Sequence, residues 1–239
     1  MLPTLGGYNS NGLLGYPDYD LIRASLKVLC GFSDITALAT AIYARTGFVT
    51  YSGPQFSTLG MRCGLDYTLK YFERCVMCEE PFGVPPADHW SHDPWYQDQE
   101  NRDLVSNPGY ELVHEGEAEG RLLGGNLGTL CLLFGTSFMP DLEGSLLVLE
   151  DDEEILPVHV DRLLRSLIHQ LGFEGVRDLV LGRFQRASEM NPDTIKAIVE
   201  SKRELAGVPV VANASFGHTT PQFTFPIGVT VGCAPQMGP

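Results

Sequence analysis

The sequence predicts an α/β fold, in which strands and helices alternate along the chain. Two patterns carry this prediction: a strand–turn–helix arrangement over 27–47, and repeated alternation of apolar runs with amphipathic stretches from 145 onward. The composition agrees, because a chain of 239 residues that is 44% hydrophobic and 19% charged can bury a substantial core.

The first clear elements lie in KVLCGFSDITALATAIYARTG at 27–47. The apolar run at 28–30 is typical of a buried strand, and apolar residues then recur at helical spacing until Gly47 supplies a stop. The corner between the two elements holds Ser33 and Asp34, which are good N-terminal capping residues.

A serine at such a corner lies clear of the sheet, beside the positive end of a helix and free backbone N–H groups that could bind an oxyanion. The α/β-hydrolase elbow has this geometry, but its G-x-S-x-G pattern fails here because Ile35 replaces the second glycine. Ser33 is therefore either a nucleophile or the cap of an ordinary helix.

Cysteines and histidines follow in a C-x2-C, ten-residue gap, H-x2-H series that loosely resembles a zinc finger. The spacing differs from that of a finger, and three prolines occupy the gap, so we expect a helix end followed by a surface loop, without metal. A metal module stays open as an alternative. Its ligands would be Cys75, Cys78, His89 and His92.

Prolines, polar residues and both tryptophans, Trp90 and Trp95, cluster between 81 and 113 without clear periodicity. We expect this stretch to connect two lobes or to form a lid over a site.

The second half alternates strand and helix patterns. The expected strands are 145–149, 176–184 and 208–213, and the expected helices are 159–172 and 191–207. The first helix would bury one face and end at Gly172. That face comprises Val160, Leu163, Leu164, Leu167, Ile168 and Leu171.

Three chemically useful side chains follow apolar strands: Ser33, Glu150 and His218. In open α/β sheets, ligands bind outside the carboxyl ends of the strands, and these three residue types can form a catalytic triad. The alternatives are that Glu150 belongs to a solvated acidic turn, EDDEE, and that His218 is a polar loop residue.

The formal net charge of −14 argues against nucleic acid or an anionic membrane surface as partner, because both attract basic patches. A small acidic or neutral substrate is compatible with it. The N-terminus lacks a signal-peptide pattern, and six scattered cysteines fit reduced thiols, so we expect a cytoplasmic location.

Several ordered motifs together resemble the LD-carboxypeptidase family of serine peptidases, and within it the microcin C immunity (MccF-like) branch. The similarity spans essentially the whole chain. The motifs are GGYNSN at 6–11, CGFSDITAL at 30–38, YSGP at 51–54, GGNLGTL at 124–130, LED at 149–151 and NASFGH at 213–218.

The resemblance implies a flavodoxin-like or Rossmann-like N-terminal lobe over 1–84, a connection or lid over 85–113, and a swivelling, β-barrel-like α/β lobe over 114–239. Family members carry further strand–helix units before the Gly-Gly turn, so the N-terminal lobe is expected to be truncated. The resulting hypothesis is that the chemistry is encoded here while this chain alone folds poorly or is inactive.

The resemblance also implies roles for individual residues. The nucleophile would be Ser33, with Glu150 and His218 completing the triad, and members use no metal or cofactor and pair as homodimers. The remaining roles are an oxyanion hole and a substrate-binding surface. The oxyanion hole would be formed by Asp34 with Gly6 or Gly7, and the substrate contacts would come from Trp95, with Trp90 as the alternative, and from Tyr8 and Asn9.

Two activities follow from the family. The immunity branch hydrolyses an amide that joins an aminoacyl or peptidyl group to a nucleotide, and the continuation YARTGFVTYSGP favours this branch. The alternative is removal of the terminal D-alanine from a murein tetrapeptide. A catalytically silent binding module is an alternative of another class.

Overall fold

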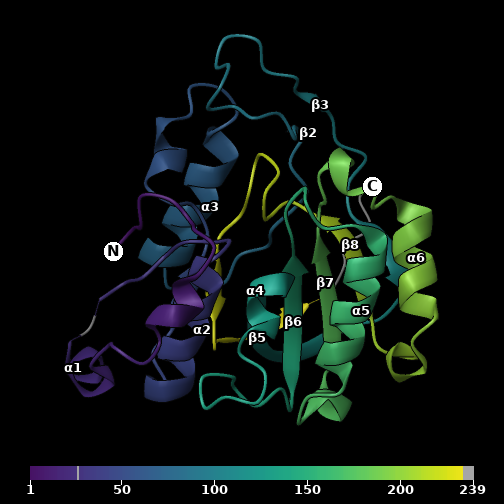
Figure 1. The fold of residues 1–239 in the computed structure, drawn as a ribbon. Helices are drawn as coiled ribbons and strands as arrows, with labels where there is room; N and C mark the ends of the chain where they lie inside the picture. The colour runs from purple at the N-terminus through teal and green to yellow at the C-terminus, as the bar shows by residue number, and fades with distance from the viewer. Residues whose placement is uncertain (26, 234–239) are drawn as a thin grey trace.

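The computed structural model describes residues 1–25 and 27–233 and has the predicted α/β class. Its centre is a mixed six-stranded sheet in the order β10-β5-β6-β7-β8-β4 (Figure 1). The four middle strands are parallel, and the two edge strands are antiparallel to their neighbours. These strands are β4 (Glu111–His114), β5 (Ala118–Asn126), β6 (Ser145–Glu150), β7 (Asp178–Gly182), β8 (Val210–Ala214) and β10 (Thr230–Cys233).

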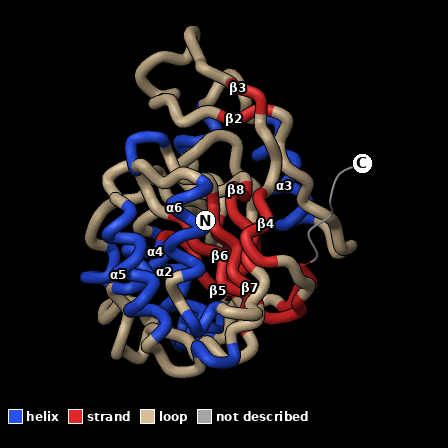
Figure 2. Tube along the Cα trace, turned by 90° about the vertical axis from the view of Figure 1, so that its right-hand side faces the viewer, coloured by secondary structure: helices blue, strands red, loops and turns tan. Residues whose placement is uncertain are grey.

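Helices lie on both sides of this sheet. Figure 2 shows α2, α4, α5 and α6 on one side of the strands and α3 on the other. The helices are α1 (Tyr19–Ala24), α2 (Ile35–Thr46), α3 (Asp66–Met77), α4 (Leu127–Cys131), α5 (Pro157–Ile168) and α6 (Pro192–Glu200). The alternation of β6, α5, β7, α6 and β8 confirms the order predicted for the second half of the chain.

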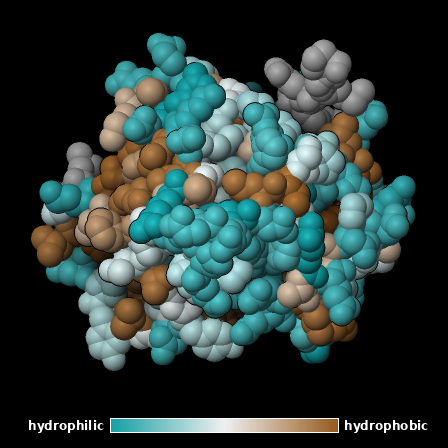
Figure 3. Space-filling view, turned by 90° about the horizontal axis from the view of Figure 1, so that it is seen from above, coloured by the Kyte–Doolittle hydropathy of each residue, from teal (hydrophilic) through white to brown (hydrophobic). Residues whose placement is uncertain are grey.

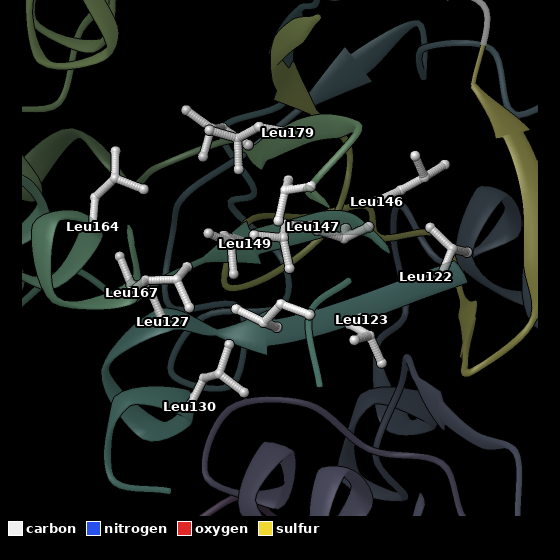
Figure 4. Close-up of a cluster of buried hydrophobic side chains, with 14 of the residues drawn as sticks. Leu122, Leu123, Leu127, Leu130, Leu146, Leu147, Leu149, Leu164, Leu167 and Leu179 are labelled. Atoms are coloured by element: carbon white, nitrogen blue, oxygen red, sulfur yellow. The ribbon is translucent and has the colours of Figure 1, made fainter. Parts of the chain in front are cut away.

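Buried leucines of the sheet and of α4 and α5 form much of the core (Figure 4). The strand leucines come from β5, β6 and β7 and lie on both faces of the sheet, and burying each contributes roughly 1.5–3 kcal/mol to folding. The labelled residues are Leu122, Leu123, Leu127, Leu130, Leu146, Leu147, Leu149, Leu164, Leu167 and Leu179.

The two predicted helices of the second half are shorter than expected. α5 ends at Ile168, not at Gly172, and Leu171 is 82% exposed, so its assignment to the buried face was wrong. Gly172 instead adopts the left-handed conformation at the start of a short 3-10 turn, which buries Phe173. α6 begins at Pro192 as predicted but ends at Glu200, before a second 3-10 turn.

The N-terminal part contributes little regular sheet. β1 (Thr50–Ser52) pairs with β9 (Phe225–Ile227), and the apolar run at 28–30 forms only a parallel bridge, between Cys30 and Tyr51. The expectation of a buried strand at 28–30 was therefore too strong. The flavodoxin-like or Rossmann-like description of this lobe stays a prediction.

The segment between 81 and 113 ends in β4, and its part around β2 and β3 lies above the sheet in the view of Figure 1. It contains a short antiparallel pair, β2 (His89–Trp90) with β3 (Val105–Ser106). A partly buried ion pair closes the loop between them, because the Asp93 carboxylate accepts from Arg102 Nε at 2.8 and 2.9 Å. Arg102 also donates to Cys63 O at 2.8 Å, which ties the loop to the segment before α3.

Seen from above, the surface is largely hydrophilic, with hydrophobic areas between the polar ones (Figure 3). Within 1–25 and 27–233, no helix has the length and apolar character needed to cross a membrane.

Candidate active site

Ser33 lies at the corner between the bridge at Cys30 and the first residue of α2, as the sequence predicted. Its backbone has a φ of 61°, in the left-handed region that residues other than glycine rarely adopt. Such strain is retained where the surrounding structure fixes it, and it is common at functional sites. Gly47 ends α2 in the left-handed conformation, also as predicted.

The structure brings the three predicted side chains together. The Nε2 atom of His218 lies 3.1 Å from Ser33 Oγ, and its Nδ1 atom lies 2.7 Å from Glu150 Oε2. With the proton on Nδ1, His218 donates to Glu150 while Nε2 accepts from the serine hydroxyl. Serine, imidazole and carboxylate thus form one continuous chain of hydrogen bonds.

Glu150 is not part of a solvated turn. It ends β6, and its side chain is only 3% exposed. Two glycines make room for it: a Cβ on Gly217 would lie 2.5 Å from Glu150 Oε2, and a Cβ on Gly182 would lie 2.8 Å from Glu150 Cβ. The glycine before His218 is therefore required by the packing of the carboxylate.

The acidic surroundings of His218 change its proton affinity. Burial is the largest single effect and lowers the pKa, but the charge of Glu150 and its hydrogen bond raise it, with further contributions from Asp152 and Asp151. Together these contributions raise the pKa of His218 to about 9, from an ordinary value of 6.5. The edge of Phe32 packs against the imidazole, with ring centroids 5.2 Å apart.

The predicted oxyanion groups also meet beside Ser33. A Cβ on Gly6 would lie 3.1 Å from Ser33 Cβ and 3.2 Å from Ser33 Oγ, so the backbone of the Gly-Gly turn lies close to the nucleophile. Among the described residues, the backbone N–H groups of Asp34, Gly6 and Gly7 donate no hydrogen bond. The Asp34 side chain does not cap α2, contrary to its predicted capping role, and bonds to Ser10 instead.

Sequence reasoning missed a buried polar group on the neighbouring strand ends. Asp151 accepts from the Asn126 amide and the Gly128 N–H, both at 2.9 Å, and Asn126 N–H donates to Thr36 Oγ1 on α2 at 3.0 Å. Burial, and then the charge of Glu150, raise the pKa of Asp151 to about 6. This group links the ends of β5 and β6 to the helix that follows Ser33.

The two tryptophans lie in different surroundings. Ser91 pairs with Thr220, two residues after His218, so the tryptophan segment is joined to the histidine loop. Trp90 has the Arg183 guanidinium over its ring at 4.7 Å, whereas Trp95 has an edge contact with Tyr96.

Of the other predicted contacts, Tyr8 and Asn9 are exposed, and Asn9 lines an open cavity of about 520 Å³ beside the Gly-Gly turn.

The cysteine and histidine series gives no metal site in the described part of the chain, where no group of three His, Cys, Asp or Glu side chains is arranged to hold a metal ion. Its first two members are at the end of α3, and the third lies on β2.

Comparison with known proteins places these residues in a family. The protein-family model described as LD-carboxypeptidase N-terminal domain matches residues 1–53 of the sequence. The family model described as LD-carboxypeptidase C-terminal domain matches residues 119–232. YocD of Bacillus subtilis (strain 168), provisionally named a carboxypeptidase, is 52% identical over 231 residues, which are 96% of this chain and 71% of YocD.

Solved structures agree with this comparison. An MccF-like protein from Bacillus anthracis str. Ames superimposes with a TM-score of 0.95 at 53% identity, covering 97% of this chain and 71% of that one. The structure of MccF in complex with glutamyl sulfamoyl guanosine superimposes with a TM-score of 0.84 at 30% identity, covering 98% of this chain and 72% of MccF.

Proposed function

This chain belongs to the LD-carboxypeptidase family, and from that premise we propose that it is a serine hydrolase that cleaves an amide in a small peptide conjugate. The observation that carries the proposal is the hydrogen-bonded series from Ser33 through His218 to Glu150 at 3.1 and 2.7 Å. Ser33 is the nucleophile, His218 the general base and Glu150 the group that orients the imidazole.

The reaction is acyl transfer through a covalent intermediate. Ser33 Oγ attacks the scissile carbonyl carbon while its proton passes to His218 Nε2. The carbonyl oxygen becomes an oxyanion, which the N–H groups of Asp34 and of Gly6 or Gly7 stabilise. His218 then protonates the leaving nitrogen, and water releases the acyl group by the same steps in reverse.

The preferred substrate is an aminoacyl or peptidyl group joined to a nucleotide. A relative of the same fold has been solved with glutamyl sulfamoyl guanosine, a compound of this class. Trp95 is the better candidate than Trp90 to stack on the base, because Arg183 already covers the ring of Trp90. Tyr8 and Asn9 would line the same approach.

Removal of the terminal D-alanine from a murein tetrapeptide is the second candidate. The match to both LD-carboxypeptidase models favours it. Only the nucleotide conjugate carries a nucleobase, so the effect of Trp95→Ala on KM distinguishes the two candidate substrates. It should raise KM for the nucleotide conjugate by about 10-fold or more while leaving KM for the tetrapeptide unchanged.

The direct test is hydrolysis of glutamyl sulfamoyl guanosine and of the tetrapeptide, followed by mass spectrometry. We expect the wild-type chain to release guanosine sulfamate, and Ser33→Ala to lose on the order of 10⁴-fold or more in rate while remaining folded. Equal hydrolysis by Ser33→Ala would overturn the assignment of the nucleophile. Binding of either compound by a folded chain without any turnover would favour the silent binding module.

A further inference from the structure

Asp34 follows the nucleophile, and its carboxylate is buried beneath the Gly-Gly turn. Its Oδ2 atom accepts from the Ser10 N–H at 2.9 Å and from the Ser10 hydroxyl. A Cβ on Gly7 would lie 2.8 Å from the same oxygen, so the turn packs directly on this carboxylate. Asp34 therefore contacts the turn through its side chain, and among the described residues its own N–H donates no hydrogen bond.

Few hydrogen bonds hold the turn, although Gly6 packs against Ser33 and Gln55. Before it, Thr4 O accepts from Ser57 N–H at 3.1 Å, and after it comes the Ser10 contact. Within the described part of the chain, no hydrogen bond anchors residues 5–8. The side chain of Tyr8 is exposed, and the cavity of about 520 Å³ lies against the turn, so packing contributes little on that side.

We propose that Asp34 is a positioning residue that sets both halves of the oxyanion site. Its backbone N–H supplies one donor, and its carboxylate, acting through Ser10, fixes the Gly6–Gly7 turn that supplies the other. The inference rests on the proposed function. Position matters because an oxyanion donor is effective only within a narrow range of distance, and loss of one donor costs on the order of 10²–10³-fold in rate.

The test is the rate at which a fluorophosphonate phosphonylates Ser33, because its phosphoryl oxygen occupies the oxyanion site. We expect Asp34→Ala to lower this rate about 100-fold or more, and Ser10→Ala to lower it by a smaller factor. The double variant should be no slower than Asp34→Ala, because both changes remove the same restraint. Asp34→Asn should recover part of the rate, since its amide oxygen still accepts from Ser10.

Asp18→Ala is the matched control. Asp18, like Asp34, accepts two hydrogen bonds, here from the backbone N–H groups of Asp20 and Leu21 at the start of α1, so its loss should not change the rate.

A role through the triad is distinguished by the pH midpoint of labelling, which His218 sets. Ser10→Ala changes no charge, so it should lower the labelling rate without moving this pH midpoint. The inference is overturned if the midpoint moves, or if the rate is unchanged in both Ser10→Ala and Asp34→Ala. If Asp34→Ala does not fold, Ser10→Ala decides. Failure of the wild-type chain to label at Ser33 would instead overturn the proposed function.

Discussion

At the scale of single residues, the acidic surroundings of His218 set the working pH. A general base must be neutral, and the pKa of His218 is about 9, so kcat/KM should be half-maximal near that pH and level off only about one unit above it. With an unperturbed histidine, whose pKa is roughly 6.5, kcat/KM would already level off near pH 7.5. The pH profile of kcat/KM from pH 6 to 10 measures this directly.

Glu150→Gln provides the control for that profile. It removes the charge that raises the pKa of His218, so the midpoint of the kcat/KM profile should move to lower pH while kcat falls. A midpoint that does not move in Glu150→Gln would contradict the assigned pair.

The raised pKa of His218 also makes the free energy of unfolding depend on pH. Protonated His218 stabilises the fold fully below pH 6.5, and this contribution is lost as the pH rises through about 9.

Substitution of Gly217 tests the packing of the Glu150 carboxylate, for which we propose the catalytic role. Gly217→Ala combines a φ of 95° with a Cβ placed 2.5 Å from Glu150 Oε2. Gly207→Ala is matched in backbone strain, with a φ of 94°, but nothing lies within 4 Å of its Cβ. Both should lose roughly 1–2 kcal/mol of unfolding free energy, measured in urea, because of the strained backbone.

Only Gly217→Ala should also lose activity, by about 10-fold or more, because it displaces the carboxylate that orients His218. Equal activity in the two variants would show that Glu150 does not need this glycine.

The sequence predicted that Ser33, Glu150 and His218 come together because each follows an apolar run that can be recognised locally, although the run before Ser33 forms only a bridge. Ser10 and Asp151 could not be found in this way. Ser10 bonds to a residue 24 positions away, and Asp151 to one 25 positions away, so only the folded chain brings these partners together. Nothing in EDDEE distinguishes its buried first two residues from its solvated ones except their continuity with the strand.

At the scale of elements, α5 shows how a helix end decides which side chains are buried. Leu167→Ala removes a fully buried side chain and should cost about 2–5 kcal/mol of unfolding free energy. Leu171 lies past the end of the helix and its side chain is exposed. Leu171→Ala should therefore change the free energy of unfolding by less than about 0.5 kcal/mol. Urea unfolding of both variants checks this; similar losses would place Leu171 in the core after all.

Periodicity located α5 and α6 but not their ends. The glycines at 172 and 207 do adopt the left-handed conformation, yet in each case a 3-10 turn lies next to the glycine, beyond the end of the α-helix. Local glycine signals mark where the chain turns. How many residues before the turn remain helical depends on which side chains the sheet can bury.

At the scale of the whole molecule, exposed apolar side chains gather on the N-terminal segment. They are Met1, Leu5, Tyr8, Leu13, Tyr16, Leu21 and Val28. Such a concentration of apolar surface favours self-association.

We expect the wild-type chain to sediment with increasing mass as its concentration rises, and Leu13→Gln with Leu21→Gln to reduce this increase. Leu171→Gln, an exposed leucine elsewhere, is the matched control and should leave it unchanged. Sedimentation that is independent of concentration in the wild-type chain would contradict the expectation. The same measurement reports on the homodimer predicted from the family.

The most direct test of the central claim is fluorophosphonate labelling of this 239-residue chain, with the labelled peptide identified by mass spectrometry. We predict labelling at Ser33 alone, faster as the pH approaches 9, and none in Ser33→Ala. A folded sample that takes up no label, or that takes it up at another residue, would contradict the claim that Ser33, His218 and Glu150 act together as a catalytic site.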